Sequence, residues 1–465
     1  MQLEPPNTDL WQHAASLRAL SADLLNPANP FVVSPETSRH FQPFWVVGSF
    51  AMQTLGITEW HVLAGFSFLS MGLLAVGVYS FARVFFASRW APLTLLFVLL
   101  YGWGLQPTHT GIHAITSLTR TGPYPATLMI GAGFLLWAWV IRALDDPSYN
   151  WRVLPLTAVM LTTHQLGAVI GFVPAILFVA FWPNGALRAR IFVTVTLGLG
   201  VMAAMLWPYH NPIALMLQPG HSDWDGGEVF RQPIYLMAAF FPAIIGLSQF
   251  RKRSFRPVLC SFLFFTCVYA SSFWGVTIGV RFHAPMALMM QIGLAGVIVK
   301  YFPVFWKKAT TLRLYQVSAA LLCIVLIAVP TVRIFVDEIL VMKTRANQLE
   351  AAQELTNDIP NDQAIVASEF AVWPVVATGQ RVLSIPWPEP GIHDLRDRQK
   401  ITNALLDPVI SAQDRLALAR EHGIRTIVVS ARYFPAHGQQ MLNAISDTRR
   451  ENGEFIRFDL FDLQQ

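Results

Sequence analysis

The chain has 465 residues, of which 54% are hydrophobic and only 13% are charged, whereas a soluble globular domain has about 25% charged residues. Its net charge of +5 lies mostly in short loops between apolar stretches, which is the positive-inside pattern of membrane proteins. The three cysteines lie inside apolar stretches, so we expect neither a disulfide framework nor a thiolate metal site. Composition thus indicates a multi-pass membrane protein and excludes nucleic acid as a partner.

Apolar segments recur along the chain, and several reach the roughly 20 residues with which a helix spans the hydrocarbon core. These segments lie at 61–86, 91–105, 126–141, 153–182, 190–209, 234–249, 258–273, 284–302 and 314–332. With the basic loops taken as cytoplasmic, they predict an α-helical polytopic membrane bundle of about ten to twelve spans. The stretch 153–182 begins and ends beside basic residues, so it predicts two short helices in a hairpin that bends near His164 and Gly167.

The apolar segment 41–56 is only marginally long enough to span a bilayer. Counting it as a span would place the basic run at 251–253 outside, so we expect it to be short or re-entrant. Three regions follow: an outer loop with an amphipathic juxtamembrane helix at 1–40, a transmembrane bundle at 41–336 and an extracytoplasmic α/β domain at 337–465. Polar residues directly follow Met1 with no cleavable signal peptide, so we expect an internal start codon or translocation without a preceding helix.

The small C-terminal α/β domain is predicted from a change to polar, alternating patterns after residue 337. We expect helices at 343–358 and at 411–423, where Ser411 is an N-cap and Gly423 a stop signal, and strands at 364–368, 381–385, 424–430 and 455–461. Alternation of this kind predicts a mostly parallel sheet. The domain has no GxGxxG and no GxxxxGK[ST] sequence, so we expect no nucleotide site.

The N-terminal helix carries Asp9 and His13 four residues apart. We expect an apolar face of Leu10, Ala14, Leu17 and Leu24 and a polar face that contains both of these residues. Asp9 could then be a catalytic base with His13 as a substrate contact. The alternative is a helix N-cap, because Asp is favoured in the first turn.

The outer loop at 106–125 contains His109, His113, Arg120 and Tyr124. Its many hydrogen-bond donors suit phosphate or sugar hydroxyls, and an arginine can bind phosphate through two hydrogen bonds. The alternative is a solvated loop. The two histidines have the spacing of metal ligands on a helix, but no motif supplies a third ligand.

Arg281 and His283 lie in a tight turn at the outer end of an apolar segment. An arginine near membrane depth is unfavourable and usually faces a cavity or a partner, so this pair could neutralise an anionic headgroup. Snorkelling of Arg281 to the interface is the alternative.

A second outer loop gathers acids and histidines, namely His210, His221, Asp223, Asp225 and Glu228. A hard divalent cation accepts such oxygen ligands, although a solvated loop is the simpler explanation, so no cofactor is predicted beyond a possible divalent metal. His164 is expected to be a hydrogen-bonded core residue. Trp387 is either a sugar-stacking platform or part of a rigid turn.

Placed together, these features resemble the GT-C membrane glycosyltransferases, the superfamily of protein mannosyltransferases, aminoarabinose transferases and oligosaccharyltransferases. DLWQHAA, from Asp9 to Ala15, is similar to the acid-bearing start of their first outer loop, and NPANPF with HFQPFW, between Asn26 and Trp45, to its continuation. VVATGQRVLSIPWPEP, from Val375 to Pro390, is similar to the tails of bacterial members. The sequence differs in two respects: the transmembrane helix expected before Asp9 is absent, and no paired acidic motif such as DxD or DE follows Asp9 within the same loop.

The resemblance implies an inverting transfer of a sugar from a polyprenyl-phosphate donor to a glycan, lipid or protein acceptor on the outer face of the inner cell membrane. Asp9 would deprotonate the acceptor, and Arg281 or Arg120 would stabilise the phosphate leaving group. Asp9, Arg120 and Arg281 are expected to share one extracytoplasmic chamber. The further candidate substrate-binding residues are His13, His109, His113, Tyr124 and His283. A transporter or flippase for a lipid-linked or anionic solute, or an O-antigen-type ligase or polymerase, is the alternative.

Overall fold

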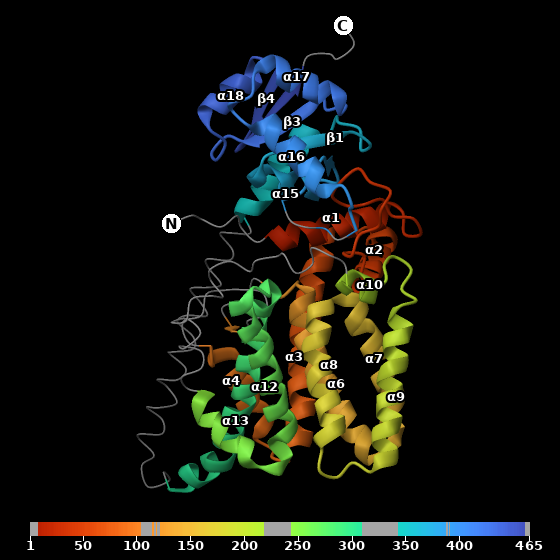
Figure 1. The fold of residues 1–465 in the computed structure, drawn as a ribbon, viewed down its shortest axis with the longest axis vertical. Helices are drawn as coiled ribbons and strands as arrows, with labels where there is room; N and C mark the ends of the chain where they lie inside the picture. The colour runs from red at the N-terminus through yellow and green to blue at the C-terminus, as the bar shows by residue number, and fades with distance from the viewer. Residues whose placement is uncertain are drawn as a thin grey trace. The chain divides into compact units, whose positions relative to one another are not determined.

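A computed structural model describes residues 8–103, 114–115, 118, 121–217, 243–308, 343–386, 389 and 391–460. Contacts divide the chain into two compact units. Unit 1 consists mainly of Met1–Leu63 and Ile339–Gln465, so it joins the two ends of the sequence; unit 2 contains most of the residues between them. Figure 1 shows the helices of unit 2 and the small sheet of unit 1.

Unit 2 is helical throughout its described parts. Its helices are α3 (Glu59–Phe86, whose first turn belongs to unit 1), α4 (Ala91–Tyr101), α6 (Pro125–Asp145), α7 (Asn150–Thr163), α8 (Gln165–Phe181), α9 (Leu187–Ala204), α10 (Pro212–Leu217), α12 (Arg256–Ser271) and α13 (His283–Lys308). Short 3-10 helices are η1 (Pro147–Tyr149), η3 (Ile244–Arg251), η4 (Arg253–Phe255), η5 (Ser272–Trp274) and η6 (Thr277–Phe282). Each predicted apolar segment that falls wholly within the described residues is confirmed as helical.

Five helical stretches in the described parts are long and apolar enough to cross a membrane: Glu59–Phe86, Pro125–Asp145, Leu187–Ala204, Arg253–Trp274 and Ile278–Tyr301. The apolar helices α4 and α8 are shorter. Segment 314–332 and most of segment 234–249 lie outside the described residues. The count of ten to twelve spans therefore stays a prediction. The helices and their hydropathy show a helical membrane protein.

Helix α6 forms the centre of unit 2, because almost its whole length is buried and it packs against α7, α8 and α9. Its backbone approaches α3 closely: a Cβ atom on Gly77 would lie 2.2 Å from the carbonyl oxygen of Gly131. The indole nitrogen of Trp137 donates a hydrogen bond of 2.7 Å to the carbonyl of Gly171 in α8. Small residues at close helix contacts, together with interhelical hydrogen bonds, are the usual means of association inside a bilayer.

The predicted hairpin at 153–182 is confirmed as α7 and α8. His164 separates them with an extended backbone, and its Nδ1 accepts a hydrogen bond of 2.9 Å from the amide of Gly167. The imidazole is therefore the N-cap of α8, which satisfies an otherwise unpaired amide at the helix start. His164 has the structural role that the sequence indicates.

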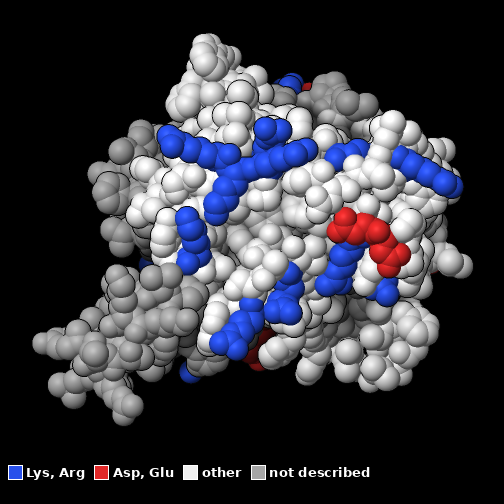
Figure 2. Space-filling view, turned by 90° about the horizontal axis from the view of Figure 1, so that it is seen from below, with Lys and Arg blue, Asp and Glu red and all other residues white. Residues whose placement is uncertain are grey.

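One end of the unit 2 bundle is rich in lysine and arginine (Figure 2). Three short connections, α3–α4, α6–α7 and α8–α9, have basic residues in or next to them. Exposed basic residues lie near these connections, at the beginning of α12 and towards the end of α13. They are Arg83, Arg89, Arg188, Arg251, Lys252, Arg253, Arg256 and Lys300. This arrangement reproduces in space the charge pattern that the sequence predicts for a cytoplasmic face.

Unit 1 combines two N-terminal helices with a C-terminal α/β fold. The elements are α1 (Thr8–Ala22), α2 (Pro43–Leu55), a helix at 343–356, β1 (Ala364–Ala367), α15 (Glu369–Ala377), β2 (Arg381–Val382), α16 (Leu395–Leu406), α17 (Ala412–Glu421), β3 (Thr426–Ser430), α18 (Ala436–Asn443), β4 (Ser446–Asn452) and β5 (Phe455–Leu460). Ser411 caps α17, and Gly423 ends it with a positive φ of 65°, as predicted. Helix α2 has 13 residues and is about 20 Å long, so segment 41–56 is short as expected.

The sheet has the order β2-β1-β3-β5-β4. Strand β1 runs parallel to β2 and β3, but β5 runs antiparallel to both β3 and β4. The prediction of a mostly parallel sheet is therefore wrong for its second half. Strand β4 was missed because it is an exposed edge strand of polar residues, and a tight turn at Gly453 folds it against β5.

The N-terminal segment completes this sheet at its other edge. Val382 in β2 donates a backbone hydrogen bond of 2.8 Å to the carbonyl of Phe31, and Val32 pairs with Val382 in a parallel bridge. Phe31 and Val32 are fully buried, and the Phe31 ring packs edge-on against Trp373 of α15 at 6.1 Å. The N-terminal segment is thus an integral part of the C-terminal domain.

We predict that Phe31→Ala destabilises unit 1 by about 3 to 5 kcal/mol, because it leaves a cavity between the N-terminal segment and α15. Thermal unfolding of the purified protein in detergent, followed by tryptophan fluorescence, measures the effect. Leu25→Ala is the control, because Leu25 is 93% exposed. Equal melting temperatures for the two variants would contradict the role of Phe31.

Candidate functional site around helix α1

Helix α1 holds Asp9 in its first turn and His13 one turn later. The helix lies where the sequence predicts it, but its expected amphipathic character is wrong. His13 on the predicted polar face is buried, as are Ala14 and Leu17 on the apolar face, because α2 and α15 both pack against α1. Asp9 is half-buried at the amino end of the helix, where the helix dipole favours a negative charge.

His13 lies in a cluster of aromatic rings. Its imidazole is 5.2 Å from the ring of Trp45 in α2 and 6.1 Å from the imidazole of His40. His40 in turn contacts Phe31 edge-on at 5.0 Å. The side chain one turn from Asp9 is therefore in contact with the loop that completes the sheet.

Arg18 connects three elements of unit 1. Its guanidinium pairs with the carboxylate of Glu59 at the start of α3, with nitrogen–oxygen distances of 2.6 and 3.0 Å. A third nitrogen donates a hydrogen bond of 2.8 Å to the carbonyl of Thr378, directly after α15. Because the Glu59 side chain is almost fully buried, this charge-assisted pair is stronger than an exposed ion pair.

Glu389 connects the segment that follows α1 to the C-terminal domain. Its buried carboxylate lies 3.2 Å from Nε of Arg39 and 3.6 Å from Nε2 of His40, and it accepts a hydrogen bond of 3.0 Å from the hydroxyl of Ser38. Burial alone would raise its pKa, but the charge of Arg39 and the contacts from His40 and Ser38 lower the pKa to about 2. The group is therefore ionised at neutral pH.

The sequence interpretation missed Glu389, Arg39, His40, Arg18 and Glu59. Their partners are remote in the chain, and the pairing becomes visible only in the folded unit. The sequence offers two local signals. One is the dense run of charged and aromatic residues at 39–45, and the other is the proline-rich sequence at 386–390.

The remaining predicted residues do not lie in unit 1. Tyr124 is buried at the amino end of α6, Arg281 is half-buried in η6, and His283 is buried at the start of α13, where its Nδ1 lies 3.2 Å from the carbonyl of Val280. His109, His113 and Arg120 lie outside the described residues. The shared chamber predicted for Asp9, Arg120 and Arg281 stays a prediction, because these residues belong to different units.

Among the described residues, no group of three His, Cys, Asp or Glu side chains comes together in a way that could hold a metal ion. His210 is described, but His221, Asp223, Asp225 and Glu228 of the same predicted loop are not, and neither is Trp387. The possible divalent metal therefore stays a prediction.

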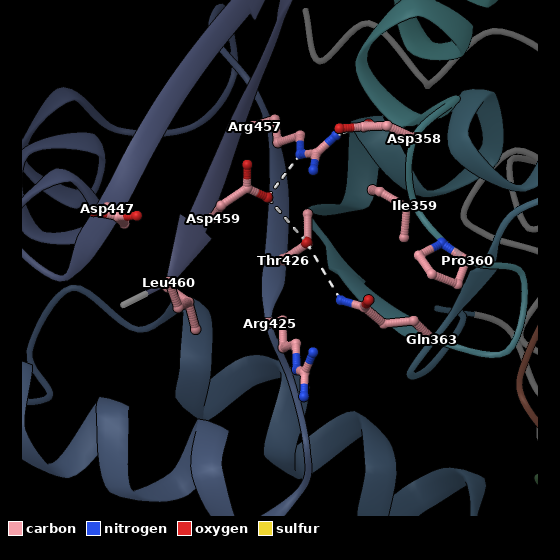
Figure 3. A pocket seen from close by; sticks show the side chains of 10 residues that line it. All are labelled: Asp358, Ile359, Pro360, Gln363, Arg425, Thr426, Asp447, Arg457, Asp459 and Leu460. Atoms are coloured by element: carbon pink, nitrogen blue, oxygen red, sulfur yellow. Dashed lines mark hydrogen bonds and ion pairs between the residues drawn. The ribbon is translucent and has the colours of Figure 1, made fainter. Parts of the chain in front are cut away.

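A polar cleft of about 300 Å³ lies at one edge of the sheet (Figure 3). Arg457 lies in it between Asp358 and Asp459, and Thr426 donates a hydrogen bond of 3.1 Å to Asp459. Burial would lower the pKa of Arg457, but its contacts with the two aspartates raise it. Because its central cation is already paired, this cleft has the character of a structural ion-pair network.

The comparisons with known proteins identify the fold. No protein-family model matches the chain, and no curated protein is significantly similar in sequence. Among solved structures, the chain is similar to ArnT from Cupriavidus metallidurans in the apo state, with a TM-score of 0.59 at 12% identity over 97% of this chain and 92% of that one. It is also similar to the apo oligosaccharyltransferase of Archaeoglobus fulgidus, with a TM-score of 0.61 at 12% identity over 94% of this chain and 67% of that one.

The chain has the GT-C fold. A further match is ArnT from the same bacterium bound to undecaprenyl phosphate, with a TM-score of 0.55 at 12% identity over 98% of this chain and 94% of that one. The resemblance that the sequence suggests is therefore confirmed at the level of the fold. Within this GT-C fold, α1 and the Glu389 contacts belong to one compact unit.

We predict that the stabilisation from Glu389 depends on pH. The folded-state pKa of about 2 lies below the ordinary value of 4.5, so the contribution is complete above about pH 4.5 and disappears as the pH falls towards 2. The melting temperature of the wild type should exceed that of Glu389→Gln at pH 7, and the difference should shrink between pH 4.5 and 2. A difference that does not vary with pH would show that the charge of Glu389 contributes nothing.

Proposed function

We propose that the protein is an inverting GT-C glycosyltransferase, which moves a sugar from a polyprenyl-phosphate donor to an acceptor at the outer face of the membrane. The observation that carries the proposal is the match to ArnT over nearly the whole length of both chains. It includes the membrane helices and the C-terminal domain, so it extends beyond a common bundle of spans.

A lipid-linked donor is supported by what similar structures contain. One ArnT structure holds undecaprenyl phosphate, and the archaeal oligosaccharyltransferase AglB, with a TM-score of 0.55 to this chain, holds dolichol phosphate and an inhibitory peptide. The sequence has neither of the glycine-rich nucleotide motifs that a soluble sugar-nucleotide donor would suggest. The identity of the sugar and whether the acceptor is a glycan, a lipid or a protein are left open by the proposal.

In the proposed reaction the Asp9 carboxylate takes the proton from an acceptor hydroxyl. The acceptor oxygen forms a bond to the anomeric carbon while the bond from that carbon to the phosphate oxygen breaks, so the configuration inverts and polyprenyl phosphate leaves. Arg281 or Arg120 stabilises the negative charge that develops on the phosphate. His13, Tyr124, His283, His109 and His113 are proposed substrate contacts.

The proposed orientation places the active site outside the cell. The basic end of the bundle, next to Arg83 at the end of α3, is the cytoplasmic end by the positive-inside rule. Helix α3 has 28 residues, so its first residue, Glu59, lies roughly 42 Å away along the helix on the other side of the bilayer. We propose that α1 and the C-terminal domain lie on the extracytoplasmic side of the inner membrane.

We predict that Asp9→Asn lowers sugar transfer by about 100-fold to 10,000-fold, because the amide cannot accept the proton of the hydroxyl. Membrane vesicles that contain the protein and the cell's own acceptors are supplied with undecaprenyl phosphate linked to radiolabelled glucose, mannose, galactose or arabinose, and movement of the label from the lipid donor to another molecule is measured. Asp23→Asn is the matched control, since Asp23 is exposed just beyond the other end of α1.

Retained activity in a folded Asp9→Asn protein would remove Asp9 from the mechanism. Movement of the intact lipid-linked sugar across the vesicle membrane without cleavage would instead support the transporter or flippase alternative.

We predict that the two ends of the molecule have opposite accessibility. The three native cysteines are first replaced by alanine, and a single cysteine is then introduced by Ser148→Cys or by Asn443→Cys. Ser148 lies in the exposed turn between α6 and α7, and Asn443 is exposed on the C-terminal domain. A membrane-impermeant maleimide should label position 443 in intact spheroplasts, but position 148 only after lysis. The reverse result would invert the proposed topology.

A further inference from the structure

The C-terminal domain holds the acid-bearing helix at two separate points. The first is Arg18, which ties the middle of α1 to the carbonyl of Thr378 and to Glu59. The second is Glu389, whose carboxylate holds Ser38, Arg39 and His40 of the loop that follows α1. Both sets of contacts lie within unit 1, so they form one compact structure.

The contacts of Glu389 extend to α1 through aromatic rings. His40 lies against the carboxylate on one side and within 6.1 Å of the His13 ring on the other. His13 in turn packs on Trp45 and lies one helical turn from Asp9, where residues four apart share a face of the helix. A shift of the loop at residues 38–40 would therefore move the packing surface next to Asp9.

The directional contacts of Arg18 and Glu389 hold α1 and the loop after it in one defined position. An arginine guanidinium donates in fixed directions, and Arg18 uses three nitrogens for two acceptors on different elements. A buried carboxylate with several donors likewise has one favoured arrangement. Neither group is predicted to touch substrate, so each would act through α1.

We propose that Arg18 and Glu389 are positioning residues through which the C-terminal domain sets the placement of helix α1, and with it Asp9, for the transfer reaction. The inference rests on the proposed function. It assigns to this domain an indirect part in catalysis, since displacing a reacting group by about 1 Å can lower a rate by roughly 100-fold.

The test compares Glu389→Gln, Arg18→Lys and the milder Ser38→Ala with wild type, using full-length protein in acceptor-containing membrane vesicles with the labelled undecaprenyl-phosphate sugar that the wild type transfers. Arg18→Lys keeps the charge beside Glu59 but has no fork with which to reach the Thr378 carbonyl. We expect kcat to fall by about 10-fold to 100-fold for the first two variants and less for Ser38→Ala, with the donor KM nearly unchanged. Asp397→Asn is the control, because it removes a carboxylate from an exposed ion pair of the same domain and should leave kcat unchanged.

Hydrogen–deuterium exchange of peptides covering 8–22 and 29–40 supplies a readout that needs no activity. Glu389→Gln and Arg18→Lys should raise exchange in α1 several-fold, and Glu389→Asp should restore part of the protection and part of kcat. If the wild-type protein transfers sugar from none of the donors to any acceptor in the vesicles, the proposed function fails, and exchange still decides whether the two residues hold α1. If the variants keep both wild-type kcat and wild-type exchange, or lose KM instead of kcat, the positioning role is overturned.

Discussion

The buried carboxylate of Glu389 is the interaction on which the arrangement of unit 1 depends. A carboxylate without partners is strongly unfavourable inside a protein, so this group needs the cation and donors of residues 38–40 beside it. Its partners lie about 350 positions away in the sequence, which means that one charge requirement joins the beginning of the chain to its end. The pairing of Phe31 with β2 and the hydrogen bond from Arg18 to Thr378 also join the N-terminal segment to the C-terminal domain. Three different kinds of contact therefore fix the N-terminal segment to the α/β domain.

Much of the membrane part could be predicted from the sequence, because a long apolar run in lipid has to satisfy its backbone internally and so forms a helix. The same reasoning located the α7–α8 hairpin, whose bend at His164 is flanked by two runs too short to be single spans. The two ends of α17 could also be predicted from the sequence, since Ser411 and Gly423 act on neighbouring backbone groups. Local signals of this type do not depend on the rest of the fold.

Tertiary contacts explain the errors. Helix α1 reads as amphipathic on its own, but packing against α2 and α15 buries its polar face as well, including His13 and Ser16. Strand β4 has the exposed, charged side chains of an edge strand, and its pairing with β5 gives the only signal that it is a strand. Of the candidate site, Asp9 and His13 could be proposed from their spacing, whereas Arg18, Glu59 and Glu389 could not, because nothing in their local sequence identifies a partner so far away.

The insertion of Phe31 and Val32 beside β2 has a consequence for biosynthesis. These residues leave the ribosome early, but the strand that receives them is made only after the membrane helices have been translated. The sheet thus cannot reach its final form during synthesis, and its assembly needs closure of a very long loop, which is slow although its entropy grows only gradually with length. Until β2 is made, the apolar residues Phe31 and Val32 have no strand with which to pair, so a product interrupted before β2 would expose them to quality-control proteases.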